Sequence, residues 1–153
     1  MIVNSLKLAN CQSSNRSKGN SSFYPPSILV IEDDRDNLIL LYHFLRSSHF
    51  DVFLASDALT GLKLATAHPP DLILLDIMMP KMSGYELLRH LRQNFKLMSI
   101  PVIAVTGMST EAEHRDILQA GCADYICKPF LLDQLQAAIQ NQLTGIAPRV
   151  AIN

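Results

Sequence analysis

Short apolar runs alternate with longer amphipathic stretches along most of this chain. The apolar runs are continuous, which is typical of strands buried on both faces of a parallel sheet. The amphipathic stretches carry apolar residues at helical spacing, as with Leu38, Leu41 and Leu45. The pattern predicts strands over residues 27–31, 51–55, 71–75, 100–105 and 124–127. It predicts helices over residues 36–48, 58–67, 83–93, 110–121 and 133–143.

Alternating strands and helices predict an α/β fold, because each helix carries the chain back to begin the next parallel strand. Right-handed crossovers then put helices on both faces of a doubly wound, five-stranded parallel sheet. Sheets of this kind bind ligands at the carboxyl ends of their strands, so that edge is where a functional site is expected.

The chain divides into one domain and two tails. Residues 1–26 are rich in Ser and Asn and lack periodicity, which predicts a disordered N-terminal tail. The predicted domain covers residues 27–143, and residues 144–153 form a short C-terminal tail. Because so little sequence follows the last helix, we expect no separate output domain. The domain is then a stand-alone module that acts through contacts with another protein.

Composition narrows the classes of function. The chain has 153 residues and a formal net charge of -1, so no electrostatic attraction to nucleic acid or to an anionic membrane is expected. No apolar run approaches the ~20 residues that span a bilayer, so no membrane insertion is expected. Cys11, Cys122 and Cys127 form no C-x-x-C pair. They suit free thiols in a reducing cytoplasm, which is the location we expect.

Polar side chains stand where the predicted strands end. The first strand is followed by Glu32 and Asp33, the third by Asp76, the fourth by Thr106 and the fifth by Lys128. In a parallel sheet these ends share one edge, so carboxylates, a hydroxyl and an ammonium converge there. Neighbouring carboxylates repel one another, and a hard divalent cation such as Mg²⁺ relieves the repulsion. The pattern predicts a metal site at this edge.

Four segments of the chain resemble the receiver domains of bacterial response regulators. They are ILVIEDD (28–34), PDLILLDIMMPKMSGYELL (70–88), IPVIAVTG (100–107) and GCADYICKPF (121–130). Each segment is weak alone, but together they occur in order and on the predicted strand ends. The resemblance implies the flavodoxin-like receiver fold with strand order 2-1-3-4-5. It also implies a signalling switch of a two-component system, controlled by transient phosphorylation.

The resemblance further implies roles for the acidic residues. Asp76 is expected to be the phosphoacceptor and to form an acyl phosphate. Glu32, Asp33, Asp76 and the backbone carbonyl of Met78 are expected to hold Mg²⁺, with Mn²⁺ as a substitute. Asp34 follows the acidic pair and is expected to start the first loop or helix, not to bind the metal directly.

The other strand-end residues are expected to sense the phosphoryl group. The resemblance implies that Lys128 pairs with Asp76 before phosphorylation and with a phosphoryl oxygen afterwards. The peptide bond between Lys128 and Pro129 is expected to be cis. Thr106 is expected to donate its hydroxyl to the phosphoryl group, and Tyr125 to turn inward as Thr106 moves. The output surface is then the fourth helix, fifth strand and fifth helix.

The expected phosphodonor is a sensor histidine kinase or a histidine phosphotransfer protein. Neither the kinase nor the downstream target is identified by the sequence, and a homodimer formed on phosphorylation stays open. Met78 and Met108 flank the expected path of the hydrolytic water in the family. Two apolar side chains there predict slow self-dephosphorylation.

Two other functions compete with a phosphorylated switch. One is a pseudo-receiver, which has the fold but acts as an interaction module without phosphorylation. The other is a metal-dependent phosphohydrolase of the haloacid-dehalogenase kind, which also uses an Asp nucleophile. The hydrolase needs a second Asp two residues later, where this chain has Met78. We expect no enzyme activity beyond the chain's own phosphorylation and dephosphorylation.

Overall fold

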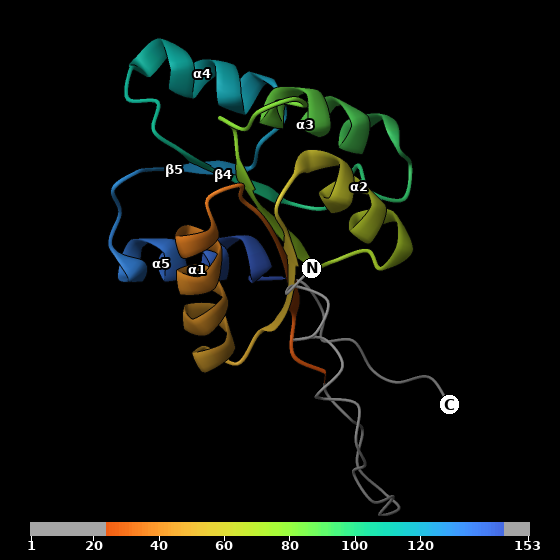
Figure 1. Ribbon diagram of the computed structural model, residues 1–153, viewed down its shortest axis with the longest axis vertical. Helices are drawn as coiled ribbons and strands as arrows, with labels where there is room; N and C mark the ends of the chain where they lie inside the picture. The colour runs from red at the N-terminus through yellow and green to blue at the C-terminus, as the bar shows by residue number, and fades with distance from the viewer. Residues whose placement is uncertain (1–23, 146–153) are drawn as a thin grey trace, which may run out of the picture.

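A five-stranded sheet lies between two layers of helices in the computed structural model, which describes residues 24–145 (Figure 1). The strands are β1 Ser27–Ile31, β2 Asp51–Ala55, β3 Leu72–Asp76, β4 Val102–Thr106 and β5 Asp124–Cys127. The helices are α1 Arg35–Ser47, α2 Ala58–Ala67, α3 Gly84–Gln93, α4 Glu111–Gln119 and α5 Leu132–Leu143. Both predicted tails lie almost entirely outside the described residues.

All strand pairs are parallel, in the order β2-β1-β3-β4-β5. This confirms the predicted doubly wound fold and the strand order that the resemblance implied. The chain winds outward from β1 to β2 and then in the opposite direction through β3 to β5. The winding therefore reverses between β1 and β3, where open α/β sheets form a crevice. Ile31 pairs with Leu75 there, so the residues that follow β1 lie beside the end of β3.

The strands send alternate side chains into two separate cores. Helices α1 and α5 cover one face of the sheet, and α2, α3 and α4 cover the other (Figure 1). In β3, Leu72 and Leu74 pack toward α1 and α5, whereas Ile73 and Leu75 pack toward α2 and α3. All five residues of β3 are buried. This two-sided burial explains why its sequence is apolar without a break until Asp76.

Two strands differ from the prediction at both of their ends. The third strand begins at Leu72, because Asp71 turns its carboxylate back onto the backbone N–H of Ser27 at 2.8 Å. The strand then includes Asp76, which was predicted to follow it. The fourth strand begins at Val102, after Pro101, whose nitrogen has no hydrogen to donate to a strand ladder. It ends on Thr106, so Asp76 and Thr106 are the last residues of neighbouring strands.

The helix starts follow side-chain capping. Thr110 and Glu113 form the predicted capping box at the start of α4. Asp34 caps α1, and its carboxylate accepts a hydrogen bond from the Asn37 N–H at 2.9 Å. The expectation that Asp34 starts the first helix is therefore confirmed. Within residues 24–145, the helices are all too short or too polar to cross a bilayer.

Candidate functional site

Three carboxylates meet at the switch point between β1 and β3. Glu32 and Asp33 follow β1, and Asp76 ends β3. Each offers one oxygen atom that lies within 4.8 Å of the others. Glu32 is only 2% exposed and Asp76 only 6%, whereas Asp33 is open to solvent. The site is therefore a small acidic pocket with two buried carboxylates in its wall and a third at its mouth.

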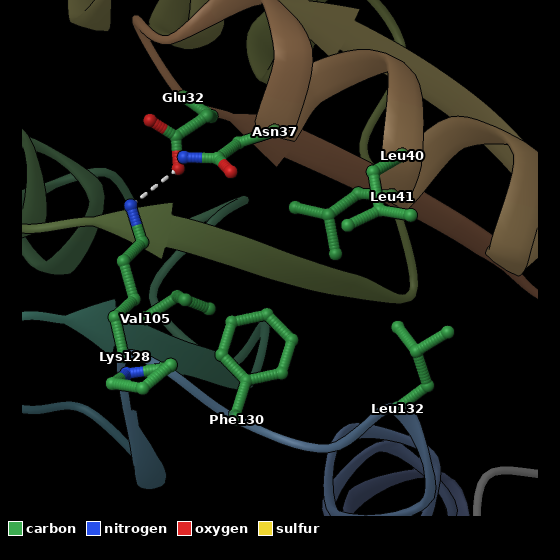
Figure 2. A pocket seen from close by; sticks show the side chains of 9 residues that line it. Glu32, Asn37, Leu40, Leu41, Val105, Lys128, Phe130 and Leu132 are labelled. Atoms are coloured by element: carbon green, nitrogen blue, oxygen red, sulfur yellow. Dashed lines mark hydrogen bonds and ion pairs between the residues drawn. The ribbon is translucent and has the colours of Figure 1, made fainter.

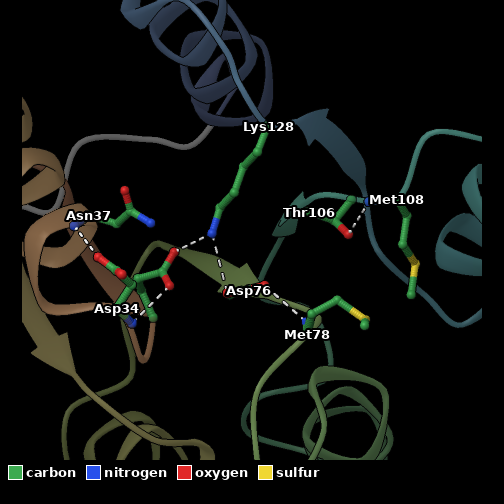
Figure 3. Close-up of polar contacts among 8 residues, drawn as sticks. Asp34, Asn37, Asp76, Met78, Thr106, Met108 and Lys128 are labelled. Carbon is green, nitrogen blue, oxygen red and sulfur yellow. Dashed lines mark hydrogen bonds and ion pairs between the residues drawn. The ribbon is translucent and has the colours of Figure 1, made fainter.

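Lys128 supplies positive charge to this acidic pocket. Its Nζ donates to Glu32 Oε2 at 2.7 Å (Figure 2) and to Asp76 Oδ2 at 3.3 Å (Figure 3). Lys128 follows β5, so its side chain crosses the end of β4 to reach β1 and β3. The Lys128–Pro129 peptide bond is cis.

Burial and neighbouring charges have opposite effects on the pKa of Glu32 and on that of Lys128. Burial raises the pKa of Glu32 even though the hydrogen bond from Lys128 lowers it. Burial lowers the pKa of Lys128, but Glu32 and Asp76 outweigh burial and leave that pKa above its usual value. The pocket thus holds three carboxylates and one ammonium, so it keeps excess negative charge. All the donors are oxygen atoms, so the set fits a hard divalent cation.

Backbone N–H groups fix how the buried carboxylates point. The N–H of Met78 donates to Asp76 Oδ1 at 2.9 Å, and the N–H of Asp34 donates to Glu32 Oε1 at 3.1 Å. The second oxygen of each carboxylate faces Lys128. The Met78 side chain is exposed, while the part of its backbone that bonds Asp76 lies at the pocket.

Thr106 lies at the end of β4 and is completely buried. Its Oγ1 accepts a hydrogen bond from the N–H of Met108 at 3.1 Å (Figure 3). Tyr125 lies on β5 on the side of the sheet that α4 covers, and its ring stacks on His114. The two ring centroids are 4.1 Å apart, with 22° between the planes. The structure therefore brings Tyr125 against α4.

The sequence did not reveal His114, which stacks on Tyr125, or the two residues that contact its Nε2. His114 Nε2 lies 3.2 Å from Cys127 Sγ and 3.2 Å from the carbonyl oxygen of Met108. His114 is on α4 and Cys127 is on β5, so no local spacing links them. The one available signal was the strand period of two, which puts Tyr125 and Cys127 on the same face of β5.

An apolar cavity of about 410 Å³ adjoins the acidic pocket (Figure 2). Glu32 and Lys128 form its polar end, and the rest lies between α1 and the segment that joins β5 to α5. Its apolar lining includes Leu40, Leu41 and Phe130. Leu40 is 51% exposed, so part of the apolar lining of this cavity reaches the solvent.

Comparisons with a family model and with known proteins agree on one family. The family model described as the response regulator receiver domain matches residues 28–140. The polar-differentiation response regulator DivK of Brucella anthropi is 35% identical over 119 residues, which cover 78% of this chain and 97% of DivK. The DivK of Brucella ovis is 35% identical over 117 residues, covering 76% of this chain and 95% of that protein.

Solved structures show the same fold. The receiver domain of the sensor histidine kinase PA1611 from Pseudomonas aeruginosa has a magnesium ion coordinated in its active-site cleft. It is 30% identical, with a TM-score of 0.73, and the match covers 79% of this chain and 99% of that one. The chemotaxis protein CheY4 of Vibrio cholerae has a TM-score of 0.74 at 23% identity, over 78% of this chain and 99% of its own. At that identity the second likeness concerns the fold alone.

Proposed function

The chain belongs to the response regulator receiver family, and on that premise we propose that Asp76 accepts a phosphoryl group in a Mg²⁺-dependent step. The donor is a sensor histidine kinase or a histidine phosphotransfer protein. The observation that carries the proposal is the acidic pocket itself. Two carboxylates lie within 4.8 Å of the Asp76 carboxylate, and the Lys128 ammonium is 3.3 Å from it.

The metal would be held by Glu32, Asp33 and Asp76, with the Met78 carbonyl as the further ligand proposed from the family. When bound, Mg²⁺ offsets the negative charge of the phosphoryl oxygens. The receiver domain of PA1611 binds magnesium in its cleft, which supports the same choice of metal here.

Asp76 is the proposed nucleophile because its orientation is fixed. The Met78 N–H holds Oδ1, and the other oxygen, Oδ2, faces Lys128. A carboxylate oxygen forms a bond to phosphorus, while the bond between phosphorus and the donor's histidine nitrogen breaks. Lys128 then moves its hydrogen bond from the carboxylate to a phosphoryl oxygen.

Thr106 and Tyr125 would carry the signal away from Asp76. Among residues 24–145, the Thr106 oxygen accepts a hydrogen bond from the Met108 N–H, and its hydroxyl hydrogen can turn toward new phosphoryl oxygens. Movement of Thr106 frees space beside β5, and Tyr125 turns into that space. The face formed by α4, β5 and α5 changes as a result, and a partner protein reads it.

A phosphodonor protein has to reach Asp76 from the open edge of the sheet. The apolar cavity and the exposed Leu40 lie at that edge and offer it a contact surface. Leu40→Asp should therefore slow transfer from a phosphorylated donor protein and leave phosphorylation by acetyl phosphate unchanged. Profiling phosphotransfer from the host's histidine kinases would identify the donor. We expect the two proteins to meet in the cytoplasm, the family's usual location.

The decisive test is phosphorylation by acetyl phosphate with Mg²⁺, read by intact-protein mass spectrometry. We expect one phosphoryl group on the native chain and none on Asp76→Asn or in EDTA. An unmodified native chain would favour the pseudo-receiver alternative. Steady turnover of a phosphate ester would favour the phosphohydrolase.

The lifetime of the phosphoprotein gives a second measurement. Met78 and Met108 carry no group that orients a water molecule, so slow self-dephosphorylation is expected. Met78→Asn should shorten the lifetime, because an amide can hold that water by hydrogen bonds. An unchanged lifetime would contradict this reading of Met78.

A further inference from the structure

Cys127 and His114 form a contact outside the acidic pocket that the proposed phosphotransfer does not use. Cys127 is the last residue of β5 and pairs with Thr106 of β4. Its Sγ lies 3.2 Å from His114 Nε2, within hydrogen-bond reach for sulfur. The side chain of Cys127 is partly exposed, and so is that of His114. A small reagent can therefore approach this thiol from solvent.

The chain supplies an internal contrast for this thiol. Cys122 is only 7% exposed, and burial raises the pKa of its thiol to about 12. A thiol in that state stays protonated and is a poor nucleophile. Cys127 differs in two respects, since it is accessible and has an imidazole nitrogen against its sulfur. The two cysteines should therefore differ widely in reactivity.

The neighbours of His114 favour a proton on its Nε2, where it can donate to the thiolate of Cys127. A thiol and an imidazole in hydrogen-bond contact are the usual arrangement of an activated cysteine nucleophile. The carbonyl oxygen of Met108 lies 3.2 Å from the same Nε2. A carbonyl cannot donate, so it bonds this nitrogen only when the nitrogen carries a proton. That Nε2–H then has two acceptors, the Met108 oxygen and the Cys127 sulfur, and it favours the thiolate form of Cys127.

We propose that Cys127 is a modification site that reacts with small disulfides, with the His114 Nε2–H as the donor that stabilises its thiolate. The thiol releases its proton to water, and the sulfur attacks one sulfur of the reagent. The reagent's S–S bond breaks as a new one forms to Cys127. The other half leaves as a thiolate and takes up a proton. The product is a mixed disulfide, which any thiol reductant reverses.

Modification of Cys127 would also change the surface around Tyr125. A sulfur 3.2 Å from an imidazole nitrogen has no room for a further group on that side. Capping turns the thiolate into an uncharged disulfide sulfur, which weakens the contact that holds His114, and His114 is the ring on which Tyr125 stacks. Thiol chemistry would thus rearrange the α4–β5 surface without any phosphoryl group on Asp76.

The test compares single-cysteine proteins built on Cys11→Ser, since Cys11 lies outside the described residues. One variant keeps Cys127 through Cys122→Ser, and the other keeps Cys122 through Cys127→Ser. Each is mixed with the aromatic disulfide DTNB, and the released thiolate is followed by absorbance. We expect Cys127 to react, and to do so about 10-fold or more faster than with His114→Phe. Cys122 should react only after denaturation.

His114→Phe is the matched variant, because it keeps a ring against Tyr125 and removes the nitrogen. Near pH 10 an ordinary thiol ionises without such a donor, so the two rates should converge there if His114 acts by favouring the thiolate. A persisting difference would mean that the Phe ring only blocks access, and the proposal would fail. Equal rates at neutral pH, or a native Cys122 as reactive as Cys127, would overturn it too.

A second measurement follows the amide resonances of the surface formed by α4 and β5. In the native fold, capping Cys127 should shift the amide resonances of Tyr125 and of residues 111–119, and reduction should restore them. Unchanged resonances would remove the proposed link to Tyr125. Asp76→Asn should react with DTNB like the native chain, so the outcome is independent of the phosphoacceptor proposal.

Discussion

Asp76 and Thr106 end neighbouring strands and are held in the same way, but the loops that follow them differ. In each case the N–H of a Met two residues later donates to the side chain, at 2.9 Å for Asp76 and 3.1 Å for Thr106 (Figure 3). The loop after Asp76 is packed: Ile77 and Met79 are both buried. The loop after Thr106 begins with the exposed Gly107.

Two glycines, Gly84 at the start of α3 and Gly107 in the loop after Thr106, show how different the packing is. A Cβ on Gly84 would lie 2.6 Å from the Ile77 Cα and 2.8 Å from the Asp76 carbonyl oxygen. A Cβ on Gly107 would meet no heavy atom within 4 Å. The backbone behind Asp76 is therefore locked, whereas the backbone behind Thr106 has room. A fixed nucleophile beside a movable hydroxyl is what the proposed switch needs.

The largest expected effect comes from a substitution that disrupts the packing behind Asp76. Gly84→Ala should lower the free energy of unfolding by about 3 kcal/mol, because two backbone atoms have to move away from the new methyl group. Gly107→Ala is the matched control and should stay within about 1 kcal/mol of the native chain. Urea unfolding of both variants measures the difference. Equal losses would mean that the two loops are equally constrained.

The next largest effect concerns the balance of charge in the acidic pocket around Asp76. Lys128→Met leaves Glu32 and Asp76 without their counter-charge, and should lower the free energy of unfolding by about 2 kcal/mol in EDTA. Saturating Mg²⁺ should recover much of this loss, because the cation replaces the ammonium. Removing the exposed Lys63 in the same way should change little. A loss that Mg²⁺ does not reduce would contradict the proposed metal site.

The sequence predicted the region around Asp76, the packed side, better than the region around Thr106 and Tyr125, the open side. Glu32, Asp76 and Lys128 were predicted to converge because parallel strands end at one edge, whatever the details of packing. The boundary of β3 was wrong by one residue, since apolar pattern alone does not show that Asp71 bonds to Ser27. The open side depends on how α4 packs across β5. That packing rests on contacts distant in sequence, so no local pattern pointed to His114.

The stack on the open side should contribute a smaller amount of stability. His114→Ala removes the ring that lies 4.1 Å from Tyr125, and should lower the free energy of unfolding by about 1 kcal/mol. His114→Phe keeps a ring there and should lose less. Urea unfolding measures the stability of both variants, and calorimetry their Mg²⁺ affinity. Neither variant should alter Mg²⁺ affinity, and a change would mean that the two regions are coupled before phosphorylation.

The smallest expected effect is a pH dependence of folding stability that comes from Glu32. Burial, opposed by Lys128, raises its pKa, so the folded chain keeps this proton at pH values where the unfolded chain has lost it. The contribution of Glu32 to stability must then fall as pH rises from its ordinary pKa of 4.5 through the folded value. Asp57 and Glu113, whose pKa values are lowered by hydrogen bonds from Thr60 and Thr110, give the opposite slope. The test is therefore a difference: in EDTA, Glu32→Gln should gain stability relative to the native chain as pH rises through this window. A constant difference would mean that Glu32 titrates as it does in water, and that its burial beside Asp76 imposes no electrostatic cost for a cation to relieve.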